Sequence, residues 1–413
     1  MAAVSLTLTL LYAHLLFEPH IESFQNWETY DAYRYHFEAA QASRLDLADI
    51  FDVKYSTNSR FPQFLAILYK VFRPDPLVGC ALNWASWALA GWLLGPLVGG
   101  GSGGRSTREA ARAVTAFWVC WFLLPDAFDW CGTTSKEPLC ALLVALGVRA
   151  VARFGSATSP RAAGAWLALL GLTIPPLIWV RGAALALPVA GVLAALELRS
   201  RPQATTRAWA VTAVFVGLLV AYASSSFLPD SEANPFAESG SRKLAQVDPR
   251  ALTSDSALRT ISSSNKALDA IALPIRGVAH LVVPLNSPPW NLPIAKVAAP
   301  SLVQWTSAAM YCIALCSVVL RVADAFRKRV RLPDATVLLG TAFVAGIIVL
   351  GLSGIVHERY RSILMPAYLP IALDAFLREL RIRGGSRLAL FAGAVALAAL
   401  ISYIFVKSWA TGA

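Results

Sequence analysis

Four short clusters of charged and aromatic side chains interrupt an otherwise apolar chain, and they hold the residues best suited to do chemistry. A carboxylate can act as a general base, and guanidinium or ammonium groups can bind phosphate. Ionisable groups near membrane spans are costly to place, so their convergence on one side of a membrane would indicate an active site. The clusters are Glu28-Asp31-Arg34-Tyr35-His36, Lys136-Glu137, Arg181 and His357-Glu358-Arg359-Arg361.

The first cluster belongs to residues 26–40, which read NWETYDAYRYHFEAA. In a helix, Glu28 and Asp31 share a face and Tyr35 lies a turn further on. A carboxylate beside an aromatic surface at the membrane interface could act as a general base, or hold a metal ion or a sugar hydroxyl. The alternative is an amphipathic interfacial helix whose polar residues only face water.

Arg60 and the Lys136-Glu137 pair each have a structural and a functional interpretation. Arg60 precedes an apolar run, so its side chain could snorkel to the interface or bind phosphate. Glu137 suits the N-terminus of a helix because the helix dipole favours a carboxylate there. Lys136 is disfavoured by the same dipole, which suggests an anionic partner such as phosphate.

Arg181 and the segment 357–361 stand between apolar runs. An arginine at the bilayer centre costs about 2.5–3.5 kcal/mol, and a position in a tight outer turn reduces this cost. The functional interpretation of Arg181 is a guanidinium that binds a lipid-linked phosphate. Residues 357–361 read HERYR, and their simplest role is to bind phosphate or diphosphate while Glu358 orients an arginine.

The composition is that of a polytopic membrane protein with an all-α fold. Hydrophobic residues make up 56% of the 413 positions and charged residues 15%, whereas soluble domains carry about 25% charged residues. The mean hydropathy is +0.55. The net charge of +11 does not indicate a nucleic acid partner, because much of it falls in short loops. The six cysteines include no CxxC pair, so neither a zinc site nor a disulfide framework is expected.

Apolar runs predict about eleven membrane-spanning helices, with ten to twelve as the range, since about 20 residues cross a bilayer. The run 61–73 is shorter and suits a helix that lies in the interface or leads into the second span. The first run has no preceding Lys or Arg and no evident cleavage site, so we expect an uncleaved span. The predicted spans lie near 2–17, 77–98, 110–125, 138–153, 163–180, 182–198, 207–227, 300–320, 335–355, 362–378 and 388–407.

The distribution of arginine predicts the orientation of the chain. With the N-terminus in the cytoplasm, short loops rich in arginine near residues 105–112, 153–161, 199–207, 321–331 and 378–387 are cytoplasmic, as the positive-inside rule requires. Two long segments, 18–60 and 228–299, then form periplasmic loops of a single transmembrane domain, 1–413. All four clusters fall on the periplasmic face.

Three segments together resemble the GT-C superfamily of membrane glycosyltransferases, which use sugars linked to polyprenyl phosphate. They are Asp31-x-x-x-Tyr35-His36, the run from Arg60-Phe61-Pro62 to Tyr69-Lys70, and Arg359-Tyr360-Arg361 followed by Pro366. The similarity is greatest to the divergent bacterial members found with surface-polysaccharide genes. It implies a site at the periplasmic face of the bacterial inner membrane.

The resemblance implies roles for particular residues. Asp31 would be the base that deprotonates the acceptor, supported by Glu28 and His36, and the reaction would invert the anomeric carbon. Many members carry paired acids in the first loop, whereas here Asp31 has Glu28 three residues before it, so a divalent cation is an open question. Basic groups would stabilise the departing phosphate. The expected substrate-binding residues are Tyr35, Arg60, Lys136, Glu137, Arg181, His357, Glu358, Arg359 and Arg361.

Other functions remain open at this point. An O-antigen-type polymerase would join repeat units carried on a lipid diphosphate and would use the same outer arginines. A transporter or flippase would place polar residues and broken helices in the middle of its spans, where this chain is apolar. A membrane scaffold would need no convergent acid and bases. The expected partners are a polyprenyl-phosphate or polyprenyl-diphosphate glycolipid, the lipid bilayer and other polysaccharide-assembly proteins.

Overall fold

The computed structural model describes residues 31–53, 60–99, 107–200, 298–329, 332–352, 361–383 and 385–394, with a few more residues within 3–9 and 205–216. Every regular element in this part of the chain is a helix, which confirms the all-α fold class. The predicted spans 2–17, 207–227 and 388–407 lie largely outside these residues. The predicted periplasmic loop 228–299 lies almost wholly outside them, and the loop 18–60 lies outside them in part.

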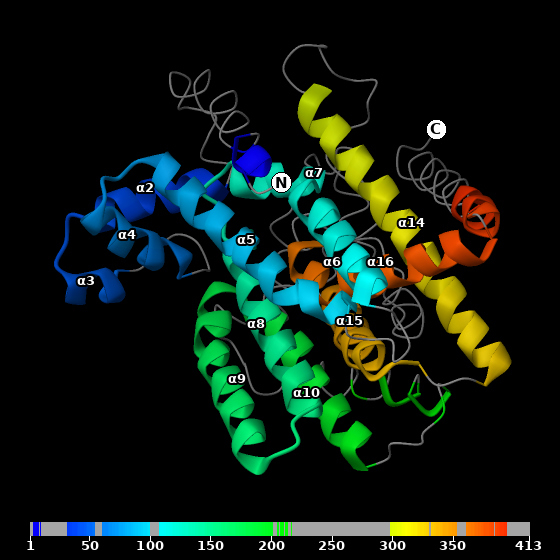
Figure 1. Ribbon diagram of the computed structural model, residues 1–413. Coiled ribbons are helices and arrows are strands. Elements are labelled where there is room, and N and C mark those ends of the chain that lie inside the picture. Colours follow the sequence, from blue (N-terminus) through cyan, green and yellow to red (C-terminus); the bar gives the residue numbers. More distant parts are fainter. Residues whose placement is uncertain are drawn as a thin grey trace, which may run out of the picture.

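The helices follow the apolar runs of the sequence (Figure 1). They are α2 Asp31–Ala42, α3 Leu47–Asp52, α4 Phe61–Val71, α5 Pro76–Gly99, α6 Thr107–Phe122, α7 Pro125–Cys131, α8 Glu137–Gly155, α9 Pro160–Arg181, the 3-10 helix η2 Gly182–Leu185, α10 Ala186–Ser200, α14 Ala298–Lys328, α15 Asp334–Leu352 and α16 Arg361–Arg383.

Four of the described helices are long and apolar enough to cross a membrane. They are Pro76–Val98, Glu137–Gly155, Pro160–Arg181 and Ala309–Lys328. These overlap the predicted spans at 77–98, 138–153, 163–180 and 300–320, so the described helices are consistent with a helical membrane protein. Helices also occupy the predicted spans at 110–125, 182–198, 335–355 and 362–378, but the total of eleven spans stays a prediction.

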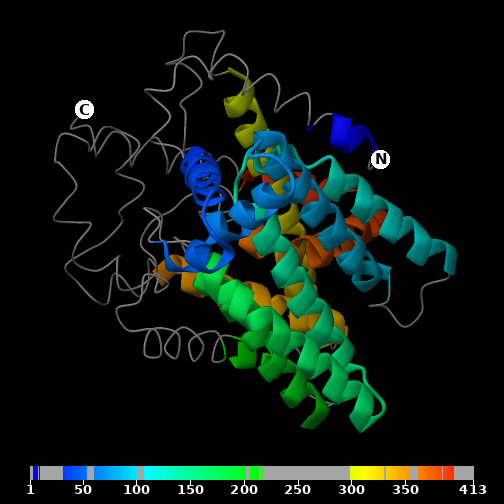
Figure 2. The same cartoon turned by 90° about the vertical axis from the view of Figure 1, so that its left-hand side faces the viewer.

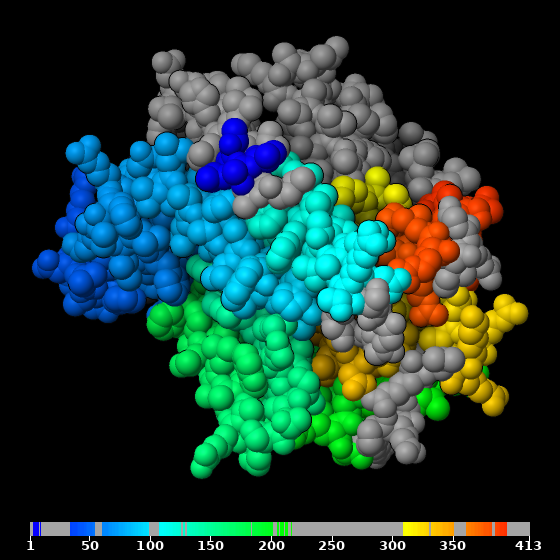
Figure 3. Space-filling model, in the orientation of Figure 1, coloured from blue at the N-terminus to red at the C-terminus, as the bar shows by residue number. Residues whose placement is uncertain are grey.

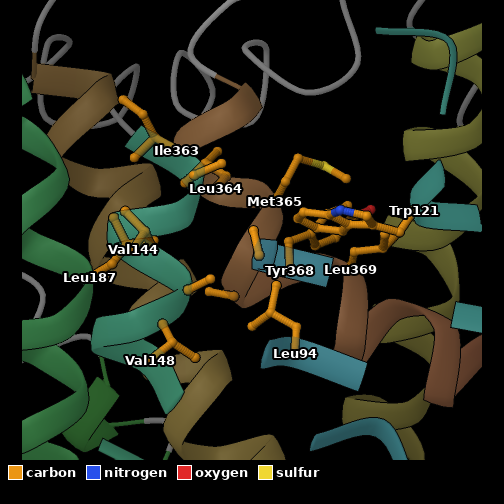
Figure 4. Close-up of a cluster of buried hydrophobic side chains, with 14 of the residues drawn as sticks. Leu94, Trp121, Val144, Val148, Leu187, Ile363, Leu364, Met365, Tyr368 and Leu369 are labelled. Atoms are coloured by element: carbon orange, nitrogen blue, oxygen red, sulfur yellow. The ribbon is translucent and has the colours of Figure 1, made fainter. Parts of the chain in front are cut away.

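Helix α8 lies at the centre of the bundle because it packs against α5, α9, α10 and α16. Figure 4 shows Val144 and Val148 of α8, Leu187 of α10, and Ile363 and Leu364 of α16 in one apolar cluster. Small residues allow this close packing. A Cβ at Gly147 would lie 2.9 Å from Cβ of Pro188, so α8 and α10 approach at that point.

Two tryptophans lock α5 to α6. The indole N–H of Trp87 donates to the carbonyl of Trp121 at 3.0 Å, and the indole N–H of Trp121 donates to the carbonyl of Trp87 at 2.9 Å. Their rings stack with centroids 4.1 Å apart. Both indoles are fully buried, so the reciprocal hydrogen bonds satisfy donors that would otherwise be costly to bury.

Helices α8 and α9 form an antiparallel pair, so α8 begins where α9 ends. Pro138 near the start of α8 lacks an N–H, which suits a first helical turn. Ser159 caps the start of α9, because its Oγ accepts from the N–H of Ala162 at 3.2 Å. We call the end of the bundle where α8 begins the Glu137 end, and the end where α8 finishes the Arg153 end.

Helices α2, α3 and α4 form a lobe at one side of the bundle (Figures 1 and 3). Figure 2, which views this side, shows the lobe in front of the upper part of the bundle, with α9 and α10 below it. The lobe has its own apolar core, in which Tyr35 and Ala39 of α2 pack with Phe61 and Leu65 of α4. The predicted helix at 61–73 is therefore present as α4.

Candidate functional site

Glu137 and Arg181 form an ion pair at the Glu137 end of the bundle. Nη2 of Arg181 lies 2.9 Å from Oε1 of Glu137, and their side chains are only 9% and 6% exposed. Glu137 opens α8 and Arg181 closes α9, so each charge also has the sign that its helix dipole favours. The ion pair gives Arg181 a structural role that the sequence alone did not suggest.

The same pair restricts how Arg181 could bind a phosphate. Removing two charges from water is costly, and their mutual attraction offsets this cost only while both remain. An anionic ligand at Arg181 would therefore meet a guanidinium already neutralised by Glu137. A guanidinium presents N–H donors on both sides of its fork, so it can hold a carboxylate and a second oxygen ligand together.

Lys136 lies directly before α8 and reaches across to the lobe. Its Nζ lies 5.5 Å from the centroid of the Tyr35 ring. A cation over an aromatic face gains about 0.5–2 kcal/mol, depending on its solvation. An aromatic ring is thus one partner of this ammonium, and the contact ties the start of α8 to α2.

Tyr35 and His36 fasten α2 to its neighbours rather than standing open to water. Tyr35 is buried, with its ring edge-on to Phe61 at 5.4 Å between centroids. Nδ1 of His36 lies 2.7 Å from the hydroxyl of Tyr69. Burial lowers the pKa of His36, an effect that the charge of Asp75 partly offsets. Neutral His36 can therefore accept the Tyr69 proton in this hydrogen bond.

The predicted base Asp31 is the first residue of α2, one turn before Tyr35. The structure describes its backbone and not its side chain. Glu28 lies outside the described residues. The packing of Tyr35 and the contact of His36 with Tyr69 hold the helix that begins at Asp31. The proposed roles of Asp31, Glu28 and His36 stay predictions.

Arg60 approaches the same end from the loop before α4. Its backbone N–H donates to the carbonyl of Trp179 at 3.2 Å, two residues before Arg181. The Arg60 side chain is exposed. The rings of Phe64 and Trp179 lie 6.1 Å apart and pack α4 on α9. Arg60, Arg181 and Lys136 therefore lie close to one end of the bundle although they are far apart in sequence.

Arg361 opens α16 and is completely buried. Its guanidinium carbon lies 5.3 Å from the ring centroid of Tyr311, and the hydroxyl of Tyr368 donates to the carbonyl of Tyr311 at 2.6 Å. Ile363 and Leu364 of the first turn of α16 belong to the same apolar cluster as Val144 of α8 (Figure 4). The predicted site residues His357, Glu358 and Arg359 lie outside the part of the chain that the structure describes.

Two further features of this end did not emerge from the sequence. Asn83 of α5 is a completely buried residue whose amide contacts the turn before α8. The sequence signal that could have drawn attention to it is a single amide side chain inside an apolar run. Asp126 and Asp129 lie in α7, between α6 and α8, and their i, i+3 spacing was the available signal. The structure does not describe the side chains of these two aspartates.

The described charged side chains of this end are mostly cations. Among the described residues, no group of three or more His, Cys, Asp or Glu side chains is placed to hold a metal ion. The cations are Lys136 directly before α8, Arg181 at the end of α9, Arg60 in the loop before α4 and Arg361 at the start of α16. Such an arrangement can bind and neutralise an anionic group such as phosphate.

Comparisons with known proteins give no match to this chain, whether with protein-family models, curated proteins or solved structures.

Proposed function

We propose that this protein is an inverting membrane glycosyltransferase that takes its sugar from a polyprenyl-phosphate-linked donor. The acceptor would be a glycan or a lipid-linked glycan of a bacterial surface polysaccharide. The observation that carries the proposal is the meeting of α2, which begins at Asp31, with Lys136 at the start of α8. This contact brings the helix of the expected base next to the Glu137–Arg181 pair.

The proposed reaction uses a base on one side and cations on the other. Asp31 takes the proton from an acceptor hydroxyl, whose oxygen attacks the anomeric carbon of the sugar. The bond from that carbon to the phosphate oxygen breaks, and the polyprenyl phosphate leaves with additional negative charge. Lys136, Arg181 and Arg361 stabilise this charge, as preorganised cations do where water is excluded.

The proposed setting is the bacterial inner membrane, crossed about eleven times, with the Glu137 end toward the periplasm. The lobe then lies at the outer interface. Exposed apolar side chains on it support this placement, since Phe37, Phe51 and Val71 are 54%, 46% and 73% exposed. Apolar side chains at that depth would insert among lipid tails.

The proposal is tested by analysing lipid-linked glycans in a deletion strain complemented with variants. Asp31→Asn removes the base while keeping its shape, and we expect activity to fall by about 10²- to 10⁴-fold. Asp49→Asn is the matched control, because Asp49 is an exposed carboxylate of the same lobe. Both variants must accumulate as folded protein in detergent.

The glycan profile separates the candidate functions. A glycan lacking one sugar in the Asp31→Asn strain, beside a complete glycan with Asp49→Asn, supports the glycosyltransferase. Single repeat units that accumulate on the lipid without long polymer would indicate the polymerase. A complete glycan in the Asp31→Asn strain would remove Asp31 from the reaction, and an unchanged profile in the deletion strain itself would favour a transporter or scaffold.

A further inference from the structure

Asn83 presents a buried amide to the turn that precedes α8. Its Nδ2 donates to the carbonyl of Thr133 at 2.7 Å and to the carbonyl of Trp130 at 3.3 Å. The residue is 0% exposed and lies in the first half of a helix apolar enough to span a membrane. The reverse orientation of the amide would set its oxygen against two carbonyl oxygens, so these contacts determine which way it points.

Gly79 lies one helical turn before Asn83 and makes room for the same turn. A Cβ at position 79 would lie 2.6 Å from Cγ2 of Thr134, a distance that side chains do not tolerate. Gly79 and Asn83 therefore form a recess on α5, which we call the α5 socket, and residues 131–135 sit in it. Ser135 stabilises the turn by a local hydrogen bond, because its Oγ donates to the carbonyl of Trp130 at 2.9 Å.

The socket fixes the point at which α8 begins. Lys136 occupies the N-cap position and makes no side-chain capping hydrogen bond, so the usual capping interaction does not set this end of the helix. The turn is instead held from outside by Asn83. The two residues that follow the turn are Lys136, whose Nζ lies over the Tyr35 ring, and Glu137, which pairs with Arg181.

We infer that Asn83 is a positioning residue: its amide holds residues 131–135 so that Lys136 and the Glu137–Arg181 pair present a preorganised cationic surface to an anionic ligand. Under the proposed function, on which this last step rests, that ligand is the phosphate of the lipid-linked donor. A polar amide within an apolar span is costly to keep. Its hydrogen bonds to the carbonyls of Thr133 and Trp130 explain its presence there, because an apolar side chain cannot donate them.

The first test needs no substrate. Acetylation of Lys136 by a water-soluble reagent is followed by mass spectrometry, with the exposed Lys70 as internal reference. Asn83→Leu keeps the number and branching of the side-chain heavy atoms and removes the donor. We expect it to change the Lys136 rate by about fivefold or more relative to Lys70, as the loss of two buried hydrogen bonds implies. Ser317→Ala is the control, because Ser317 is a buried polar residue that bonds within its own helix.

The second test measures catalysis with a short-chain polyprenyl-phosphate sugar as the probe. Asn83→Leu is expected to raise the donor KM by about tenfold, with the acceptor KM unchanged, because the lost positioning concerns phosphate binding. A merely structural role would lower the amount of active enzyme without moving either KM. If Asn83→Leu does not accumulate, Gly79→Ala tests the socket from its other side by pushing against Thr134.

The outcomes separate the inference from the proposed function. An unchanged Lys136 rate in a folded Asn83→Leu protein overturns the positioning role, whatever the enzyme does. A changed rate with an unchanged donor KM in an active enzyme also overturns it. If the wild-type protein transfers no sugar, the proposed function fails, and the acetylation comparison still decides whether Asn83 positions Lys136.

Discussion

The two ends of the bundle use charge in different ways. At the Glu137 end, the pair formed by Glu137 and Arg181 is almost fully buried, with side chains 6% and 9% exposed. At the Arg153 end, Arg381 pairs with Glu109 at 3.1 Å while 63% and 35% of these side chains remain exposed. The pair of Arg387 and Asp324 at the same end is 27% and 26% exposed.

Exposure decides what each set of charges can contribute. Ion pairs in water are worth about 0–1 kcal/mol, so the exposed pairs of the Arg153 end add little stability, and their arginines fit the predicted cytoplasmic side. Buried charges depend on their partners and are held in one geometry. Among the described residues, Arg321 and Asp374 form a further buried pair, which joins α14 to α16. The Glu137 end differs because Lys136, the residue before Glu137, also contacts Tyr35 of the lobe.

The largest difference expected between the ends is their side of the membrane. Single cysteines at Arg60 and Arg161 would report the Glu137 and Arg153 ends, since both side chains are exposed. In intact spheroplasts, a membrane-impermeant maleimide is expected to label Arg60→Cys and not Arg161→Cys, which reacts only after lysis. Most of the six native cysteines are buried and add little background. Labelling of both cysteines from outside would refute the predicted orientation.

Breaking one pair at each end should affect stability unequally. Glu137→Gln leaves Arg181 buried without its carboxylate, and we expect the free energy of unfolding in detergent to fall by about 3–5 kcal/mol. Glu109→Gln opens the exposed pair with Arg381 and should cost about 1 kcal/mol or less. Thermal and denaturant unfolding measure both variants side by side. Equal losses would show that burial does not distinguish the two ends.

The lobe beside the Glu137 end should respond to pH through His36. Burial lowers its folded pKa below the ordinary value of 6.5, so the unfolded chain binds more protons between the folded pKa and 6.5. The contribution of His36 to the free energy of unfolding is therefore complete above pH 6.5 and is lost as the pH falls toward the folded pKa. Melting temperatures from pH 7.5 to pH 5.5 in the wild type and in His36→Gln measure this effect. A pH response that survives in His36→Gln would assign it to another group.

Much of the bundle could be predicted because apolar runs and their flanking charges bound its helices. The predicted spans at 138–153 and 163–180 correspond to α8 at 137–155 and α9 at 160–181. The contact of Glu137 with Arg181 also follows from this hairpin once its two helices are antiparallel. From the sequence, Arg181 is interpreted alone, as a turn residue or a phosphate ligand, and its pairing with a residue 44 positions away is not predicted.

Side-chain contacts between distant segments could not be predicted in the same way. Tyr69 binds His36 across 33 positions, and Asn83 binds backbone carbonyls at Trp130 and Thr133, which leave no signature in the sequence. Lys136 was expected to need an anion, whereas the aromatic face of Tyr35 is one of its partners. Such contacts depend on how the lobe and α7 pack against the bundle, and periodicity does not report that packing.

The most direct test of the account compares donor binding after removing one cation at each end. Lys136→Gln removes a half-buried cation from the Glu137 end, and Arg381→Gln removes an exposed one from the Arg153 end. Binding of a short-chain polyprenyl-phosphate sugar to the protein in nanodiscs is measured by titration. We predict that Lys136→Gln weakens binding by about tenfold or more, as loss of a charged hydrogen bond implies, and that Arg381→Gln leaves it unchanged. Equal affinities for wild type and Lys136→Gln would contradict a phosphate site at the Glu137 end.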